Sequence, residues 1–303
     1  MASIIEAHEL SKRYGTLRAL DRISFRVGAG RIVGLIGRNG AGKTTLLKAI
    51  LGLTPYQGSV RVFGLEAARD RAALMSEICF IADTGVLPRW LRVDHVIGYV
   101  EGVHPRFDRK RAEAVLAGTD ICQRSRIGEL SRGMITQLHL ALILAIDARL
   151  LVLDEPTLGL DLIYRRHFYD TLLGDYLDKE RTIVLSTHQI EEVENILTDV
   201  LFIDRGHLLL DSAVEDLPKR FTLLDADPAK LSAARALRPL HVREVFGHTL
   251  MLFENRSRAS LAELGELRTP GVAELFVAKL TGPEGAGASP AHAPRAASAG
   301  ELA

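Results

Sequence analysis

Residues 34–53 read GLIGRNGAGKTTLLKAILGL, and this stretch restricts the possible fold more than any other part of the chain. Residues 37–44 satisfy the pattern G-x-x-x-x-G-K-[ST], with a strand-like run before them and apolar residues at helical spacing after them. The glycines let backbone N–H groups wrap phosphate oxygens with no Cβ in the way. Lys43 brings a positive charge to the β and γ phosphates, and the Thr44 hydroxyl can ligate Mg²⁺. The residues expected to contact the nucleotide in this stretch are Gly37, Asn39, Gly40, Gly42, Lys43, Thr44 and Thr45.

Two carboxylates end a short apolar run later in the chain. The run LLVL leads into Asp154 and Glu155, as expected of a buried parallel strand. In a doubly wound sheet, such a strand end lies beside the phosphate loop. Asp154 is then placed to orient Mg²⁺ through its water shell, and Glu155 to polarise an attacking water. The pair predicts phosphoryl transfer better than it predicts two solvated loop acids.

Composition narrows the remaining classes. The chain has 303 residues, enough for one large domain and a smaller one. Its 38 basic residues balance its 38 acidic residues, so no net charge draws it to nucleic acid or anionic lipid. Cys79 and Cys122 show no metal-ligand spacing, which favours a reducing cytosolic compartment without structural metal. The longest apolar run, residues 140–146, is far shorter than the roughly 20 residues that cross a membrane, so we expect a chain that is soluble on its own.

The order of the predicted elements indicates an α/β fold. Alternating and continuous apolar runs predict strands, the first of them in a small antiparallel sheet. Residues 84–145 are rich in helix and interrupt the sheet as an inserted subdomain, and a further helix is expected over 190–200. The predicted strands of this part of the chain are 4–11, 17–27, 31–37, 58–66, 148–156 and 181–189. Residues 201–211 are expected to close the domain as a hairpin around Arg205 and Gly206.

The remaining residues form a separate unit. Residues 220–281 are expected to fold as a small α+β domain of about one strand–helix–strand module. Its predicted helices lie near 228–237, 258–266 and 271–280. Residues 282–303 are too poor in large apolar side chains to order themselves, so we expect a disordered tail. The first domain accordingly covers residues 1–215.

These motifs together resemble the ATP-binding subunits of ABC transporters over roughly residues 4–215. Residues 130–134, LSRGM, match the signature of that family, which is usually LSGGQ. At the start of a helix, the Ser131 hydroxyl and the Gly133 N–H can bind phosphate. The resemblance implies that this helix start reaches across a dimer to the γ-phosphate held by the other subunit. The alternative is that Ser131 acts only as an N-cap.

The same resemblance assigns three further residues and the fold. Tyr14 matches the aromatic residue that stacks on adenine, although it could also pack at a strand end. Asp161 belongs to the loop that couples the two sites across the dimer. His188 matches the histidine that contacts the γ-phosphate. The implied fold is that of a P-loop NTPase, with a mixed sheet, an antiparallel edge subdomain and an inserted helical subdomain, and the implied cofactors are ATP and Mg²⁺.

The chain departs from the family pattern at Asp83 and, within the signature, at Arg132 and Met134. Asp83 stands where the family has glutamine, and its oxygen can still ligate Mg²⁺, although it is one methylene shorter and adds negative charge. Arg132 lies within the signature, where it either adds a cation near phosphate or points to solvent. An acidic residue at position 83 and an LSxGM-type signature resemble the Ytr-like ATPases of bacterial ABC-2-type systems. The ending GVAELFVAKLTG also resembles the closing helix of ABC-2-type ATPases.

Two other segments each allow two interpretations. Trp90 either faces a membrane subunit, as the place after the glutamine position does in the family, or belongs to the core. The basic run at 105–111 is typical of a solvated helix start and could otherwise contact nucleic acid. The first interpretation fits the balanced charge of the chain better, so we expect no nucleic-acid partner.

The sequence favours an ATP-hydrolysing subunit that dimerises on Mg·ATP and drives a separate membrane permease, as an exporter. Its partners would be a second copy or a similar ATPase, and a permease that holds it at the cytoplasmic face of the membrane. One alternative is an ABC ATPase that acts on ribosomes or DNA, which the single cassette and the neutral charge disfavour. Another is an ATP-gated binding module with weak hydrolysis, which Asp83 would favour and Glu155 would not.

Overall fold

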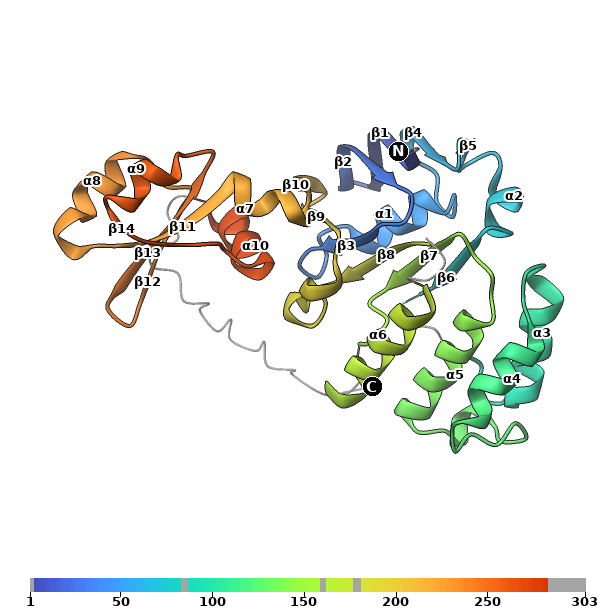
Figure 1. Cartoon of the computed structure of the whole chain (residues 1–303). Helices are drawn as coiled ribbons and strands as arrows, with labels where there is room; N and C mark the ends of the chain where they lie inside the picture. Colours follow the sequence, from blue (N-terminus) through green and yellow to red (C-terminus); the bar gives the residue numbers. More distant parts are fainter. Residues whose placement is uncertain (1–2, 83–86, 159–161, 177–180, 283–303) are drawn as a thin grey trace, which may run out of the picture. The chain divides into compact units, whose positions relative to one another are not determined.

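The computed structural model describes residues 3–82, 87–158, 162–176 and 181–282. The chain divides into two compact units, one up to Asp216 and one from Leu217 onward (Figure 1). Each unit has its own apolar core, so each is described by itself.

The first unit contains a small antiparallel sheet at its N-terminal end. Its strands are β1 (Ser3–Tyr14), β2 (Leu17–Gly28), β4 (Gln57–Val62) and β5 (Leu65–Glu66), in the order β2-β1-β4-β5. All neighbouring pairs in this sheet are antiparallel, as the alternating sequence predicts.

A six-stranded sheet forms the centre of the same unit. Its strands are β3 (Ile32–Ile36), β6 (Ile78–Ile81), β7 (Leu150–Asp154), β8 (Thr182–Thr187), β9 (Asp199–Asp204) and β10 (His207–Ala213). Their order is β10-β9-β3-β8-β7-β6, and every pair except β9–β10 is parallel. Strands β3, β7 and β8 are buried along their whole length, which explains their continuous apolar runs. The predicted mixed sheet with an antiparallel edge is confirmed.

Helix α1 (Lys43–Ile50) connects the two sheets. Leu46 and Leu47 are fully buried in the large core cluster that also contains side chains from both sheets. Helix α2 (Arg71–Met75) contributes Leu74 to the same cluster. This packing fixes the start of α1 at the edge where the parallel strands end.

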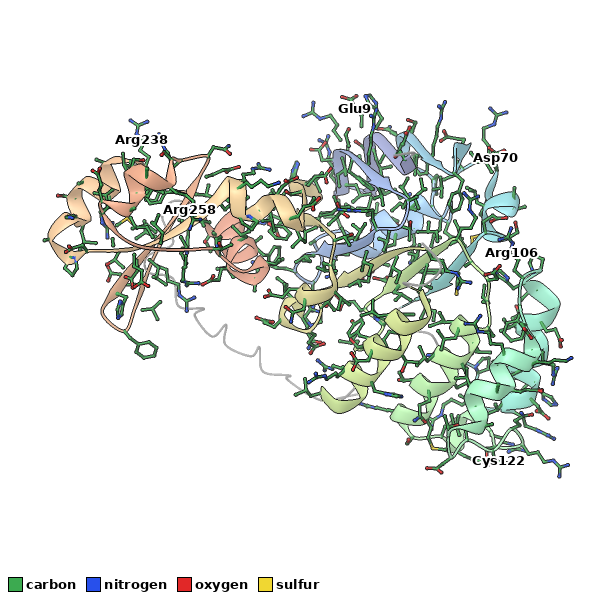
Figure 2. The ribbon with its side chains drawn as sticks, viewed as in Figure 1. Glu9, Asp70, Arg106, Cys122, Arg238 and Arg258 are labelled. Carbon is green, nitrogen blue, oxygen red and sulfur yellow. The ribbon has the colours of Figure 1, made fainter. Side chains whose placement is uncertain are left out.

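An inserted helical subdomain follows β6, as predicted. It consists of α3 (Val93–Val103), α4 (Arg109–Ala117), a 3₁₀ turn at Ile127–Glu129 and α5 (Arg132–Leu144), packed around a small apolar cluster of their own. Cys122 lies at the outer end of this subdomain and is exposed (Figure 2). Cys79 is buried in β6, and neither cysteine is in a disulfide. Helix α6 (Leu162–Tyr176) packs beside α5.

The prediction of a helix over 190–200 is wrong. The structure has two 3₁₀ turns, Ile190–Glu192 and Glu194–Ile196, and then β9. The backbone N–H of Ile32 donates to Thr198 Oγ1 at 2.8 Å, and Arg31 donates to the Asp199 carboxylate at 2.9 Å. Because Thr198 and Asp199 are held against β3 in this way, the chain cannot continue as a helix.

The second unit has more strands and helices than the single strand–helix–strand module expected. After α7 (Leu217–Arg220) come β11 (Phe221–Ala226), α8 (Leu231–Ala236), β12 (His241–Val245), β13 (His248–Glu254), α9 (Arg258–Ala262), β14 (Gly265–Arg268) and α10 (Val272–Thr281). The antiparallel sheet has the order β12-β13-β11-β14, with α8 and α9 contributing to one core cluster. This is a β-α-β-β-α-β arrangement of the ferredoxin-like kind, closed by a further helix.

Candidate active site

The phosphate loop joins β3 to α1, and two glycines determine its shape. Gly40 and Gly42 have φ angles of 80° and 110°, a region that favours glycine. A Cβ on Gly42 would come within 2.6 Å of the Ala19 carbonyl oxygen. Helix α1 has no side-chain N-cap and no acidic residue in its first turn. The N–H groups of that turn therefore remain available to bind an anion. The positive charge of Lys43 at the same helix N-terminus also attracts an anion.

The Lys43 side chain, which supplies the positive charge of the loop, is held by contacts within the protein. Its side chain is only 6% exposed. Its Nζ donates to the carbonyl oxygens of Gly37 at 2.7 Å and Arg38 at 3.3 Å. The same Nζ lies 3.0 Å from Glu155 Oε1. The lysine expected to bind phosphate is thus paired with the residue expected to act as the base.

The carboxylates that follow β7 are fixed by the neighbouring strand β8. Asp154 is almost fully buried, and Ser186 Oγ donates to its Oδ1 at 2.6 Å. The Glu155 N–H in turn donates to Ser186 Oγ at 3.0 Å. Glu155 has a φ of 49°, the left-handed region, in which a residue with a Cβ is strained. Ser186 therefore holds the Asp154 carboxylate and the Glu155 backbone at the edge of the sheet.

His188 meets Glu155 at this edge. Strand β8 ends at Thr187, and the His188 Nδ1 lies 2.9 Å from Glu155 Oε2. An ionised carboxylate only accepts hydrogen bonds, so Nδ1 carries the hydrogen in this contact. Glu155 consequently lies between a lysine and a histidine, with one oxygen directed to each.

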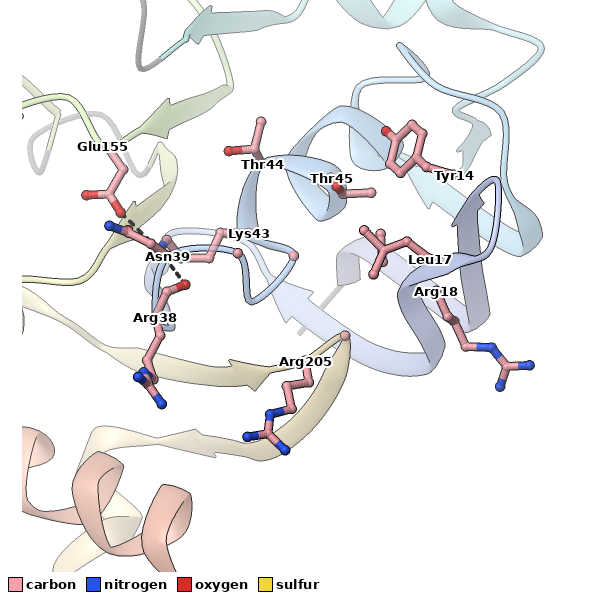
Figure 3. A pocket seen from close by; sticks show the side chains of 14 residues that line it. Tyr14, Leu17, Arg18, Arg38, Asn39, Lys43, Thr44, Thr45, Glu155 and Arg205 are labelled. Carbon is pink, nitrogen blue, oxygen red and sulfur yellow. Dashed lines mark hydrogen bonds and ion pairs between the residues drawn. The ribbon is translucent and has the colours of Figure 1, made fainter. Parts of the chain in front are cut away.

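A pocket of about 740 Å³ opens above these groups (Figure 3). The phosphate loop and the start of α1 line it, and Glu155 closes one side. Of the predicted nucleotide-contacting and catalytic residues, the pocket brings together Tyr14, Asn39, Gly40, Gly42, Lys43, Thr44, Thr45 and Glu155. Gly37, Asp154 and His188 lie next to it and do not line it.

Tyr14 marks the far side of the pocket from Glu155 (Figure 3). Tyr14 is 47% exposed, and the Lys12 Nζ lies over its ring at 4.7 Å from the centroid, so a base would stack on the face away from Lys12. A hydrogen bond with the Thr54 side chain is the main reason that the pKa of the Tyr14 hydroxyl lies below its usual value. The hydroxyl thereby contacts the connection between α1 and β4.

Sequence reasoning missed the turn between β9 and β10 as part of the site. It predicted a hairpin at Arg205–Gly206, and both residues line the pocket. The Gly206 N–H donates to the Ala41 carbonyl at 2.9 Å, and the Asp21 N–H donates to the Gly206 carbonyl at 2.8 Å. Gly206 has a φ of 77°, a backbone conformation that favours glycine. The glycine marks a turn in the sequence, but it does not indicate that the turn lines a pocket. Leu17, Arg18 and Arg38 also line the pocket without having been predicted.

The signature residues do not reach the pocket of their own chain. Ser131 is the N-cap of α5, and its Oγ accepts a hydrogen bond from the Met134 N–H at 3.2 Å. Arg132 is exposed, and Met134 packs against the cluster of the helical subdomain. Ser131 and Gly133 therefore need a second molecule to meet a nucleotide. Asp83 and Asp161 lie outside the described residues.

Two family models and several curated relatives match the sequence. The sequence pattern described as "ABC transporter" matches residues 20–158, and one described as "AAA domain, putative AbiEii toxin, Type IV TA system" matches residues 125–194. The Nod factor export ATP-binding protein I of Rhizobium meliloti (strain 1021) is 31% identical over 92% of this chain and 88% of its own length. The bacitracin transport ATP-binding protein BcrA of Enterococcus faecalis is 32% identical over 77% of this chain and 78% of its own length.

Solved structures share the fold. One described as the structure of the ATP binding subunit of an ABC transporter superposes with a TM-score of 0.65 and 24% identity, over 71% of this chain and 92% of its own. A nucleotide-free ATP-binding cassette from an ABC transporter gives a TM-score of 0.61 and 21% identity, over 70% and 92% of the two chains.

Proposed function

Because this chain belongs to the ATP-binding proteins of ABC transporters, we propose that two copies of it close around two Mg·ATP, each held between the phosphate loop of one copy and Ser131 and Gly133 of the other. As a member of this family it is an ATPase coupled to transport, with ATP and Mg²⁺ as cofactors. The observation that carries the proposal is the convergence of Lys43, Glu155 and His188 at one edge of the sheet.

The residues present fit Mg·ATP. The uncapped first turn of α1 and Lys43 suit the phosphates, and the exposed ring of Tyr14 suits the adenine. Thr44 and Asp154 would hold the metal, which supplies charge neutralisation at the phosphates. No group of three or more metal-ligating side chains is found among the described residues, so phosphate oxygens and water would complete the shell. Asp83 is proposed as a further ligand.

Glu155 and His188 would carry out the proton chemistry. The Glu155 carboxylate accepts a proton from the attacking water, for which its place at the pocket wall suits it. His188 holds that carboxylate through Nδ1, and its other ring nitrogen can donate to the γ-phosphate when both ring nitrogens carry a proton. Asp161 is proposed to couple the two sites. The rest of the rate enhancement comes from positioning and from charge stabilisation by Lys43 and the loop N–H groups.

Transport requires a membrane partner, and family membership assigns that role to a permease. No helix in the described part of the chain is long and apolar enough to cross a membrane. Trp90, Tyr99 and Val103 are 73%, 69% and 61% exposed, respectively, on the helical subdomain. We propose that these side chains face the permease at the cytoplasmic side of the membrane, since large apolar residues rarely gather at a solvated surface.

The names of the relatives support export. One is a Nod factor export protein and another a bacitracin transport protein, and both are ATP-binding proteins. We propose that this chain likewise drives an exporter, of the ABC-2 type and close to the Ytr-like subgroup. A homodimer is proposed over a heterodimer, since the chain contains both halves of the composite site, in the phosphate loop and in Ser131.

The test of this function is the mass of the Glu155→Gln chain under saturating Mg·ATP, measured by size exclusion with light scattering. We expect a stable dimer, because nucleotide binds and is not cleaved. The double variant that also carries Lys43→Ala is the control and should remain a monomer. A Glu155→Gln chain that hydrolyses ATP at the normal rate, or that stays single even with its membrane partner supplied, would refute the proposal.

A further inference from the structure

Helix α6 contacts both loops that carry the catalytic residues. It presents Arg165 and Tyr169, four residues apart and hence on one face of the helix. Arg165 Nη1 donates to Gln189 Oε1 at 2.5 Å and also pairs with Glu192 Oε1. The Tyr169 hydroxyl lies 3.3 Å from Thr157 Oγ1. One helix face therefore reaches the residue after His188 and the residue two after Glu155.

The loop after His188 is held by short-range backbone contacts and by side-chain contacts with α6. Residues Ile190–Glu192 form a single 3₁₀ turn, with few internal hydrogen bonds. The Gln189 N–H donates back to Thr187 Oγ1 at 2.9 Å. Thr187 Oγ1 also donates to the Gln189 carbonyl at 3.4 Å, and the Ile190 side chain is buried. The side chains of Gln189 and Glu192 are held by the two contacts with Arg165.

The pair of Arg165 and Glu192 is mostly buried. The two side chains are 17% and 18% exposed. Glu192 Oε2 has no hydrogen-bond partner among the described residues. Arg165 thus neutralises the Glu192 carboxylate. Without this cation the carboxylate would be an unpaired buried charge, which is costly.

The Tyr169 contact braces the loop that follows Glu155. Tyr169 and Thr157 are both 4% exposed. Burial raises the pKa of the Tyr169 hydroxyl to about 12, so the hydroxyl stays protonated and keeps its hydrogen bond at neutral pH. The Glu155 loop is accordingly held from two sides, by Ser186 and by α6.

We propose that Arg165 is a positioning residue, which fixes the Gln189–Glu192 segment so that His188 Nδ1 stays within hydrogen-bonding distance of Glu155 Oε2. Arg165 does not line the pocket and touches neither catalytic side chain in any contact described above. It acts through Gln189, which is bonded directly to His188. The inference rests on the proposed function, because it assigns a role relative to His188 and Glu155.

The test compares Arg165→Met with Arg166→Met in the full chain. Arg166 is the next residue of α6, 85% exposed, with Asp170 at 3.9 Å as its ion-pair partner. Steady-state ATP hydrolysis and the imidazole ¹⁵N resonances of His188 are measured for both. The resonance is assigned with a His188→Asn chain and needs no turnover to be read.

We expect Arg165→Met to lower kcat roughly tenfold or more, with KM changed less than about twofold, and to move the His188 resonance. Arg165→Lys should recover part of kcat, because an ammonium can still reach Glu192. The double variant Arg165→Glu with Glu192→Arg exchanges the two charges and should also recover part of kcat. The control variant Arg166→Met should behave as the wild type.

A His188 resonance that is unchanged in Arg165→Met would overturn the inference. So would a kcat within twofold of the wild type, or a loss that neither Arg165→Lys nor the charge exchange recovers. Each of these results leaves the dimer formed by Glu155→Gln intact. Failure of this inference is therefore distinct from failure of the proposed function.

Discussion

Lys43 Nζ and Glu155 Oε1 lie 3.0 Å apart, so the cation of the phosphate loop is paired with a carboxylate of the same chain. Both side chains are largely buried, at 6% and 12% exposed. A phosphate that enters the loop must replace this carboxylate as the partner of Lys43. The contact therefore links nucleotide binding to the release of Glu155.

The first prediction concerns the affinity of Glu155→Gln. Without the carboxylate, phosphate no longer competes for Lys43, and a negative charge next to the γ-phosphate is lost. We expect the Kd for ATP to fall about tenfold, equivalent to roughly 1.4 kcal/mol, while hydrolysis falls roughly 10²-fold or more. Titration calorimetry of both chains checks the first value, and an unchanged or higher Kd would contradict it.

Ser131→Ala should separate turnover from binding. Loss of the N-cap of α5 should cost about 1 kcal/mol of unfolding free energy. Turnover should be lost because the other copy's nucleotide loses its partner, while each monomer still binds ATP. Asp108→Ala is the matched control, since the Asp108 side chain caps α4 by accepting from the Arg111 N–H at 3.2 Å. It should cost similar stability and leave hydrolysis unchanged, as measured by denaturant unfolding and ATPase assay.

Tyr14→Ala should weaken nucleotide binding through loss of stacking on the base. Base–aromatic stacking contributes about 1–3 kcal/mol, so the Kd for ATP should rise roughly 5- to 100-fold. Tyr14→Phe keeps the ring and loses only the hydroxyl, and we expect its Kd to stay close to the wild type. Equal losses in both variants, measured with a fluorescent nucleotide, would argue against stacking.

The second unit should become less stable in acid through Glu254. Burial raises the pKa of its carboxyl, but hydrogen bonds from Lys279 and Arg220, each at 2.8 Å, outweigh burial and leave it below the usual 4.5. The contribution of Glu254 to the free energy of unfolding is therefore complete above about pH 4.5. It is lost as the pH falls through the lowered pKa of the folded state.

Glu254→Gln tests this contribution directly. Its unfolding free energy should be about 1 kcal/mol below that of the wild type at pH 7, and the difference should be smaller at pH 3. Chemical denaturation at both pH values measures it. A difference that persists undiminished in acid would show that the carboxylate charge is not the cause.

The parts of the site that lie in sequence motifs were predictable because local chemistry determines them. The phosphate loop, Asp154 with Glu155, and His188 each follow an apolar strand, and parallel strands bring their carboxyl ends to one edge. The place of Arg205 was not predictable, because it depends on hydrogen bonds from Gly206 to Ala41 and from Asp21 to Gly206, which join distant segments.

Two errors in the fold have a similar origin. The apolar spacing of 190–200 fits a helix, but Thr198 and Asp199 are bound to β3 and override it. In the second unit, β14 has only four residues and reads GELR, so neither alternation nor apolar content marks it as a strand. Its pairing with β11 is what completes the sheet.

The position of β3 between β8 and β9 has a consequence for synthesis on the ribosome. The strand that leads into the phosphate loop is made early, yet both of its neighbours, and the Gly206 that supports Ala41, lie more than 140 residues later in the chain. We therefore expect that a nascent chain of about half the full length does not retain ATP. Nucleotide binding should become possible only after translation has passed the hairpin at Gly206, shortly before the first unit ends at Asp216.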